Sequence, residues 1–342
     1  MTPTSMSKMK SEKVEFLVEK GAGENASLLD STYAEVATIT DRISIFKDSN
    51  IIITVQPLTD EELAKIKKGT LIISMFAPYV DNSIIGKLQK YELQGVSMDM
   101  IPRTTLAQAM DILSSMAAIA GYRAVLTAAS HLPRYFPMMI TAAGSIRPAK
   151  VLVLGAGVAG LHAIATARRL GAMVEAFDVR KAAKEEVESL GGKFIEVAGA
   201  TDDKAAGGYA IEQSEDFIKR QRAEVQNRAA KADVIITTAQ VRGRKAPILL
   251  FKETVDKMKT GSVVVDLASS TGGNCELSEN NEVIIHNGVK IIGNSVLASD
   301  MPQDASILYS NNMLNFLKLI IYDGKVVLDK ENEIIKSALI TG

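Results

Sequence analysis

Along the chain, short runs of β-branched and other apolar residues alternate with longer segments whose apolar positions recur every three or four residues. The short runs are typical of buried strands, and the longer segments are typical of amphipathic helices. Alternation of this kind predicts an α/β fold in which helices connect parallel strands. We therefore expect two doubly wound, Rossmann-like parallel-sheet domains joined by long helices.

The first third of the chain carries strand-like runs without a glycine-rich loop of its own. These runs are EFLVEKG (15–21), NIIITV (50–55), TLIISM (70–75) and GVSMDM (95–100). The intervening segments TDEELAKIKKG and DNSIIGKLQKYELQ have helical spacing, which predicts a small α/β domain. One long helix is predicted over residues 105–129, leading toward a second unit.

The second unit is predicted from a series of six or seven strand-like runs. Prolines follow the long helix, and AAGSIRPAK (142–150) is interpreted as a linker. After residue 300, DASILYSNNMLNFLKLIIY predicts a helix that packs on the first domain, followed by a short strand and a frayed end. The expected domains are residues 1–126 plus 300–342, without a glycine fingerprint, and a second, Rossmann domain over 127–299.

Composition narrows the class of protein. A chain of 342 residues fits two domains, and 47% hydrophobic with 23% charged residues fits a globular protein. A net charge of -1 gives no field that favours nucleic acid, so no nucleic-acid partner is expected. No window of roughly 18 apolar residues was found, so no membrane-spanning helix is expected. Cys275 is the single cysteine, which excludes an internal disulfide and a cysteine metal site, and no metal site is expected.

The run VLVLGAGVAGLHAIATARRLGA (151–172) carries a dinucleotide fingerprint at Gly155, Gly157 and Gly160. The first glycine permits the tight turn, the second lets backbone N–H groups approach a pyrophosphate, and the third lets the helix lie close to the sheet. The helix N-terminus then offers free N–H donors to a phosphate. The alternative is a tight turn in a fold that binds nothing.

Asp178 follows the next strand, 18 residues after Gly160. A carboxylate at this distance is expected to bind the adenosine ribose hydroxyls and to repel a 2′-phosphate, which favours NAD over NADP. Arg180 is able to receive a 2′-phosphate, but beside Asp178 we interpret it as a solvated or packing residue.

The sequence offers no clear general base. For His131, His162 and His286, a structural role is the favoured interpretation. Direct hydride transfer between two nicotinamides needs no proton acceptor, but it does need the two rings to be positioned. In PRTTLAQAMD (102–111), Arg103 donates, Asp111 accepts and Gln108 does both, so they suit a nicotinamide carboxamide. The alternative is a polar helix start, capped by Thr104 or Thr105, with Asp111 on a solvated face.

Several longer runs resemble one known family. These are PRTTLAQAMDILSSMAAIAGYRAVLTAA, FPMMITAAGSIRPAKVLVLGAGVAGLHAIATARRLGA, VESLGGKFIEV, AGGYA, KMKTGSVVVDLA, GGNCELSE and LYSNNMLNFLKL. They are similar to the NAD(H)-binding component, domain I, of proton-translocating nicotinamide nucleotide transhydrogenase, within the alanine dehydrogenase/transhydrogenase superfamily. The resemblance covers nearly the whole chain from about Val18 onward.

The resemblance implies a set of site residues. Arg103, Gln108 and Asp111 are expected to be catalytic in the sense of holding the nicotinamide. Tyr209 is similar to the tyrosine of a mobile loop, here AGATDDKAAGGYAIEQSED (198–216). The expected cofactor-binding residues are Ser114, Gly155, Ala156, Gly157, Val158, Gly160, Asp178, Val179, Arg180, Tyr209 and Ala239.

The resemblance also implies partners. Hydride is expected to pass between NAD(H) on this chain and NADP(H) on a partner domain, coupled to proton translocation by a membrane-spanning domain. A homodimer is implied, in a component peripheral to a membrane on its cytoplasmic or matrix side.

Two other functions remain open. Alanine dehydrogenase is expected to carry a lysine and a histidine after two early strands, where this chain has Gln56 and Phe76, and an aspartate near Ser270. All three groups are missing. A non-catalytic NAD sensor is the other alternative.

Overall fold

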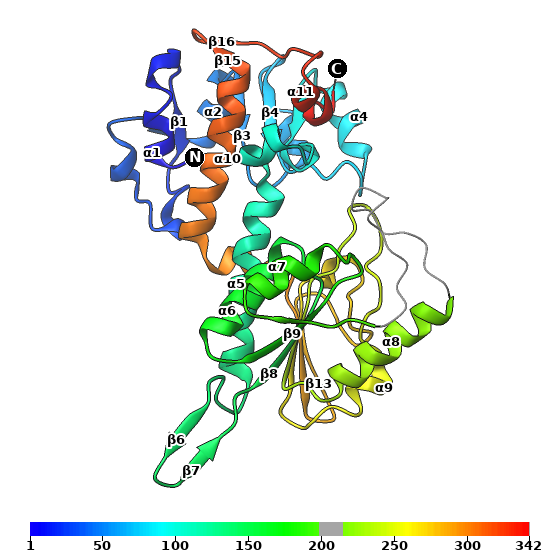
Figure 1. Ribbon diagram of the computed structural model, residues 1–342. Helices are drawn as coiled ribbons and strands as arrows, with labels where there is room; N and C mark the ends of the chain where they lie inside the picture. Colours follow the sequence, from blue (N-terminus) through cyan, green and yellow to red (C-terminus); the bar gives the residue numbers. More distant parts are fainter. Residues whose placement is uncertain (198–214, 342) are drawn as a thin grey trace. The chain divides into compact units, whose positions relative to one another are not determined.

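The computed structural model describes residues 1–197 and 215–341 (Figure 1). The chain forms two compact units: unit 1 is Met1–Met116 with Pro302–Gly342, and unit 2 is Ala117–Met301. The domain limits expected from the sequence, 1–126 plus 300–342 and 127–299, stay a prediction.

The described part of unit 1 is built on a parallel sheet in the order β3-β4-β5. The strands of unit 1 are β1 (Leu17–Glu19), β2 (Thr38–Thr40), β3 (Ile51–Ile53), β4 (Leu71–Ser74), β5 (Gln94–Ser97), β15 (Ile321–Tyr322) and β16 (Lys325–Val326). Its α-helices are α1 (Pro3–Ser7), α2 (Arg42–Asp48), α3 (Asp60–Leu63), α4 (Ser83–Lys90), α10 (Pro302–Ile320) and α11 (Glu333–Ala338). The four strands predicted in this region are confirmed, and each is shorter than its apolar run.

Alternating strand residues bury both faces of the β3-β4-β5 sheet, as the period of two requires. On one face, Ile73 and Val96 share a core with Met313 and Phe316 of α10. On the other face, Ile72 packs in a separate core that includes residues of α3 and α4. The helix predicted after residue 300 is therefore confirmed, and its Met313, Phe316 and Leu317 are buried in the core on this face of the sheet.

The described residues up to Thr341 form α11 and pair with β5, so the frayed end predicted from the sequence was wrong for them. Ile335 and Ala338 of α11 are buried in the unit 1 core. Beyond α11, the Ile340 amide donates to the Gly95 carbonyl at 2.9 Å, and the Gly95 amide donates to Thr341 Oγ1 at 2.7 Å. The tail thus pairs with β5 and covers backbone groups that an edge strand would leave unpaired.

The described residues of unit 2 form a seven-stranded sheet in the order β10-β9-β8-β11-β12-β14-β13, parallel except for β13. The strands are β8 (Lys150–Leu154), β9 (Met173–Phe177), β10 (Lys193–Phe194), β11 (Val234–Thr237), β12 (Val263–Asp266), β13 (Glu282–His286) and β14 (Val289–Gly293). Because the chain runs from β8 outward to β10 and then returns to β11, the strand order reverses between β8 and β11. Open α/β sheets bind ligands at such a switch point.

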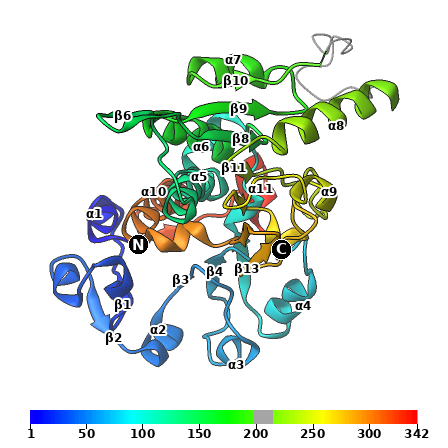
Figure 2. The same cartoon turned by 90° about the horizontal axis from the view of Figure 1, so that it is seen from below.

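Helices cover both faces of this sheet (Figure 2). The helices are α5 (Ile112–His131), α6 (Val158–Arg169), α7 (Ala183–Ser189), α8 (Glu215–Ala229) and α9 (Lys252–Val255). One core joins α5, α6 and α7 to the sheet, and a second joins α8 and α9 to the opposite face. The doubly wound pattern predicted for this region is confirmed.

The segment interpreted as a linker contains a β-hairpin instead. β6 (Met139–Thr141) and β7 (Gly144–Ile146) pair antiparallel and stand away from the unit 2 sheet (Figure 1). Gly144 has a φ of 128°, a conformation that side chains disfavour, and it allows the turn. The small residues that resembled a linker are therefore the turn of a hairpin.

The single helix predicted over 105–129 was wrong at its start. Residues Thr105–Met110 form a 3₁₀ helix, η5, and α5 begins after Asp111.

The prediction that no window could span a membrane was also wrong. Among the described residues, α5 passes this test of length and composition. In unit 2, its Ala124, Val125 and Ala128 are fully buried in the core, and 33% of the apolar window of the helix is buried.

Candidate nucleotide-binding site

The glycine-rich turn lies directly after β8, at the switch point of the unit 2 sheet. Gly155 has a φ of 103°, and a Cβ there would lie 2.6 Å from Thr238 Oγ1. A Cβ on Gly160 would collide with the carbonyl oxygen of Gly155. By contrast, a Cβ on Gly157 would meet no described atom within 4 Å. Two of the glycines are therefore required by the turn itself, whereas Gly157 faces open space.

The N-terminus of α6 is free to receive an anion. Gly157 is its N-cap residue and offers no side chain, so no side-chain cap from the described residues satisfies the first N–H groups of the helix. The first turn carries no acidic residue that would oppose a phosphate. The positive end of the helix dipole and these N–H groups point out beside the open space at Gly157. Val158, the first helical residue, is partly exposed there.

Asp178 is tied to the same turn. Its Oδ2 accepts a hydrogen bond from the Ala156 amide at 2.8 Å, and its side chain is only 8% exposed. The backbone amide of Arg180 donates to Oδ1 at 2.8 Å, while Val179 between them is exposed. The carboxylate therefore fixes the turn and lies at the carboxyl edge of β9.

Arg180 is exposed, as expected of a solvated residue, but it also pairs with Asp178, which was not predicted. Its Nε lies 3.1 Å from Asp178 Oδ1, and its Nη2 lies 3.2 Å from Oδ2. The hydrogen bond to Asp178 raises the pKa of the Arg180 guanidinium above its usual range. A ribose hydroxyl that binds Asp178 must share the carboxylate with this guanidinium or displace it. Displacement is feasible because the Arg180 side chain is 44% exposed.

A second polar network supports the turn from β11 and β12. Thr238 Oγ1 donates to the Gly155 carbonyl at 3.0 Å. The Ala239 amide donates to Asn274 Oδ1 at 2.9 Å, and the Asn274 amide donates to the buried Asp266 at 2.8 Å. Thr238, Asp266 and Asn274 were not predicted from the sequence. The signal that could have found Thr238 and Asp266 is a polar residue at or just after the end of a buried strand, whereas Asn274 lies in the loop after β12 and carries no such signal.

These features fit a dinucleotide. A pyrophosphate is matched by the open space at Gly157 and the uncapped helix N-terminus, and a ribose is matched by the nearly buried carboxylate of Asp178. Ala239 lies at the end of the neighbouring strand, where its position is fixed by Asn274.

The Arg103–Asp111 segment belongs to unit 1. The side chains of Arg103 and Gln108 are exposed and make no hydrogen bond or ion pair with the described residues. Leu106 between them is 85% exposed, whereas Ala107 and Met110 are buried in the unit 1 core. The segment thus exposes Arg103 just before η5, and Leu106 and Gln108 on η5 itself.

Asp111 has a structural role whatever else it does. Its Oδ1 accepts from the Ser114 amide at 3.0 Å, and its Oδ2 accepts from Ser114 Oγ at 2.7 Å. This is the hydrogen-bond pattern of an N-cap, placed at the start of α5. The alternative predicted from the sequence, a capped helix start, is therefore found here, but the capping residue is Asp111 and not Thr104 or Thr105.

The tyrosine and the other histidines considered from the sequence lie outside the described residues or away from the glycine-rich turn. Tyr209 lies outside the described residues. His286 Nε2 lies 2.6 Å from Asp256 Oδ1, and His131 Nδ1 lies 3.1 Å from Lys290 Nζ. Burial, and then the charge of Lys290, lower the pKa of His131.

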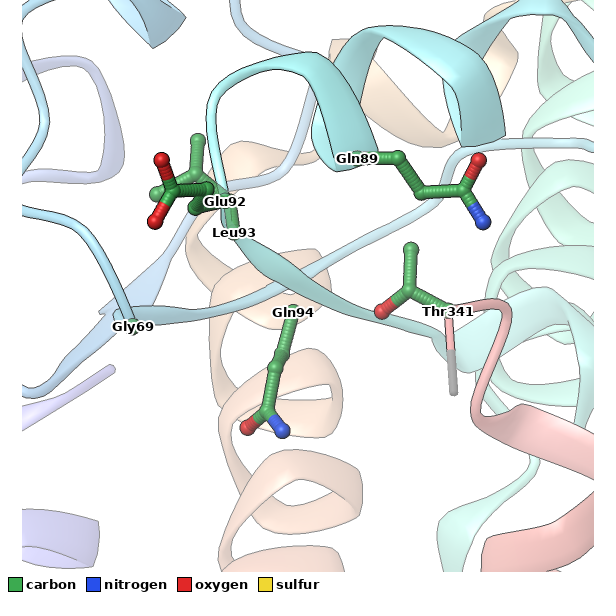
Figure 3. Close-up of a pocket in the computed structure, with 6 residues that line it drawn as sticks. All are labelled: Gly69, Gln89, Glu92, Leu93, Gln94 and Thr341. Carbon is green, nitrogen blue, oxygen red and sulfur yellow. The ribbon is translucent and has the colours of Figure 1, made fainter.

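A cavity of about 400 Å³ in unit 1 involves none of the predicted site residues (Figure 3). It is lined by Gly69, Gln89, Glu92, Leu93, Gln94 and Thr341.

The two sheets and the glycine-rich turn define a two-unit Rossmann-like protein with a candidate dinucleotide site. Residues 1–120 match the family described as "Alanine dehydrogenase/PNT, N-terminal domain", and residues 124–342 match "Alanine dehydrogenase/PNT, C-terminal domain". The chain belongs to this alanine dehydrogenase/PNT family, and membership implies the binding of a nicotinamide nucleotide.

Within the family, the similarity to transhydrogenases is much higher than that to alanine dehydrogenases. An NAD(P) transhydrogenase alpha subunit of Rhodospirillum rubrum is 44% identical over 330 residues, covering 93% of this chain and 85% of that protein. The crystal structure of transhydrogenase from Sinorhizobium meliloti superposes with a TM-score of 0.91 at 40% identity, covering 99% of this chain and 93% of that chain. Alanine dehydrogenase of Mycolicibacterium smegmatis is 24% identical over 280 residues, covering 80% of this chain and 69% of that protein.

Proposed function

We propose that this chain is the NAD(H)-binding component of a proton-translocating transhydrogenase. It exchanges a hydride with NADP(H) bound on a partner domain. The observation that carries the proposal is the complete glycine turn with Asp178 at the switch point, in a chain 44% identical to a transhydrogenase alpha subunit. No proton-accepting residue is assigned, because transfer between two nicotinamides requires positioning rather than a general base.

The proposal gives each part of the nucleotide its own protein groups. Gly157 and the N-terminus of α6 bind the pyrophosphate through N–H donors. Asp178 binds the adenosine ribose, with Arg180 moving aside. The nicotinamide supplies the hydride when bound, and Arg103, Gln108 and Asp111 orient its carboxamide. The other expected contacts, Ser114, Ala156, Val158, Gly160, Val179, Tyr209 and Ala239, are included in the proposal.

The same carboxylate is the reason to propose NAD(H) on this chain and NADP(H) on the partner. A 2′-phosphate beside Asp178 would meet a negative charge in a nearly buried setting, where repulsion is stronger than in water. Arg180 weakens this argument only if its guanidinium leaves Asp178 and pairs with the phosphate instead.

Exposed apolar side chains support the proposed partners. Leu106, at the centre of the Arg103–Gln108 surface, is suited to be covered by the NADP(H)-binding domain. The β6–β7 hairpin exposes Ile140 to 76% and Ile146 to 43%, and an isolated hairpin is marginally stable in water. We propose that a second copy of the chain covers it in a homodimer. Proton movement would be carried by membrane-spanning components, with this chain peripheral to the membrane on the cytoplasmic or matrix side.

A reconstitution assay tests the proposal. The purified chain is mixed with an NADP(H)-binding domain of a transhydrogenase, and hydride exchange between NAD(H) and NADP(H) is followed spectroscopically. Transfer that depends on both proteins is expected. If no transfer occurs and pyruvate with ammonia consumes NADH, the chain is an amino-acid dehydrogenase. If NADH binds tightly and neither reaction occurs, the chain is a sensor.

A further inference from the structure

One backbone carbonyl in the Arg103–Asp111 segment receives two side-chain donors. Asn312 Nδ2 donates to the Ala109 carbonyl oxygen at 2.9 Å, and Asn315 Nδ2 donates to the same oxygen at 3.1 Å. Both asparagines belong to α10, more than 200 residues away in sequence but within unit 1. Ala109 directly follows Gln108, so these bonds orient the peptide next to a proposed nicotinamide contact.

Packing and polar contacts fix the amide groups of both asparagines. Asn312 is 6% exposed, and its Oδ1 is buried without a partner among the described residues. If the amide were rotated, this oxygen would face the Ala109 carbonyl and the hydrogen bond would become a repulsion. Asn315 Nδ2 also donates to the Asn311 carbonyl at 2.9 Å, which restricts its side chain. The two donors are therefore held in place before any nucleotide binds.

The segment is fixed at its other end and along its buried side. Ser337 Oγ of α11 donates to the Met100 carbonyl at 2.7 Å, just before Arg103. Ala107 and Met110 are buried with residues of α10 in the unit 1 core. A 3₁₀ helix has poorer hydrogen-bond geometry than an α-helix, so η5 relies on such outside contacts.

We propose that Asn312 and Asn315 are positioning residues for hydride transfer, which set the place of Gln108 and Asp111 through the Ala109 carbonyl. The inference rests on the proposed function, because it assumes that this segment orients the nicotinamide. Neither asparagine touches the nucleotide in this scheme. Their effect is on ring position, where a misplacement of about 1 Å costs on the order of 100-fold in rate.

The test uses Asn312→Asp. This variant keeps the size of the side chain but replaces the NH2 group of Asn312, which donates to Ala109, with an oxygen that accepts. A double variant, Asn312→Ala with Asn315→Ala, removes both bonds without adding a charge. The control is Ser310→Ala on the same helix, because the hydrogen bonds that the buried Ser310 Oγ accepts come from the amide and hydroxyl of Thr2, at 2.8 and 3.2 Å, and not from the segment. Each variant is compared by thermal unfolding, NADH affinity, rate of transfer to the NADP(H)-binding domain and hydrogen exchange of residues 101–111.

We expect faster exchange in residues 101–111 and a transfer rate lower by about 10- to 100-fold for the asparagine variants, with NADH affinity within about threefold. Ser310→Ala should leave exchange and transfer unchanged even if it lowers the melting temperature equally. Unchanged exchange in the asparagine variants would overturn the inference. Faster exchange with unchanged transfer would also overturn it, while the proposed function would stand if Gln108→Ala still slowed transfer. A Gln108→Ala variant with full activity would instead remove this segment from the site.

Discussion

The glycine-rich turn of unit 2 and the Arg103–Asp111 segment of unit 1 are held in different ways. The turn is fixed by steric limits at Gly155 and Gly160 and by contacts from the strand ends around it, including Asp178 and Thr238. The segment contains a half-exposed 3₁₀ helix whose Ala109 carbonyl is held by side chains of α10, and Ser337 of α11 holds the Met100 carbonyl ahead of the segment.

This difference indicates how each region tolerates change. In the turn, the proposed phosphate-binding groups belong to the backbone, so added volume is the most disruptive change. In the segment, the proposed nicotinamide contacts are side chains on a backbone that other elements support. Substitutions there should separate activity from stability, and the following predictions test this contrast.

The largest effect is expected for Gly160→Ala. The new Cβ collides with the backbone of Gly155, which cannot give way as a flexible side chain would, so we expect a loss of about 3 kcal/mol of stability together with nucleotide binding. Gly157→Ala is the matched control, since its Cβ meets no described atom and its φ is -76°. This variant should unfold normally but bind NADH about 10- to 100-fold more weakly, because phosphate contacts to the turn are lost. Calorimetry and NADH titration measure both quantities, and equal stability loss in the two variants would contradict the assignment.

The next largest effect is expected for Gln108→Ala. Its side chain is exposed and makes no hydrogen bond with the described residues, so the melting temperature should not change. NADH affinity should stay within about tenfold, because one hydrogen bond of roughly 1–1.5 kcal/mol is lost. The transfer rate should fall by on the order of 100-fold, because ring position decides it. Stopped-flow transfer with the NADP(H)-binding domain measures this, and an unchanged rate would exclude Gln108 from the site.

The contrast also explains what the sequence could predict. The tight turn at Gly155 and Gly160 could be predicted because the glycine spacing, followed by Asp178 after the next strand, is a local pattern in the sequence, while the contacts of these residues with a nucleotide stay a prediction. The 3₁₀ conformation of η5 was missed because the apolar spacing of TLAQAM also fits an α-helix, and its support comes from α10. The tail was predicted to fray for the same reason: its place on β5 depends on Gly95, 246 residues away from Thr341. Long-range contacts of this kind leave no local pattern.

A smaller effect is expected for Asp178→Asn. The amide keeps an oxygen for the Ala156 N–H, so the turn should survive, but the charge that holds Arg180 is lost. NADH affinity should fall about tenfold, because hydrogen bonds to a charged group contribute more than neutral ones. NADPH affinity should rise, since the repulsion of a 2′-phosphate is gone and Arg180 is released. Titration with the two nucleotides measures the ratio of affinities, and an unchanged ratio would show that Asp178 does not discriminate between them.

The smallest effect is expected for Asp111→Ala, and it tests whether the segment also depends on contacts of its own. Loss of the N-cap bonds to Ser114 should cost about 1 kcal/mol and lower the melting temperature by a few degrees. Asp111→Asn keeps an acceptor for the Ser114 amide and should restore that stability. If transfer is slow in Asp111→Ala and also in Asp111→Asn, the carboxylate acts on the nucleotide in addition to capping α5. If Asp111→Asn restores both stability and transfer, capping is sufficient to explain Asp111, and the nicotinamide contacts reduce to Arg103 and Gln108.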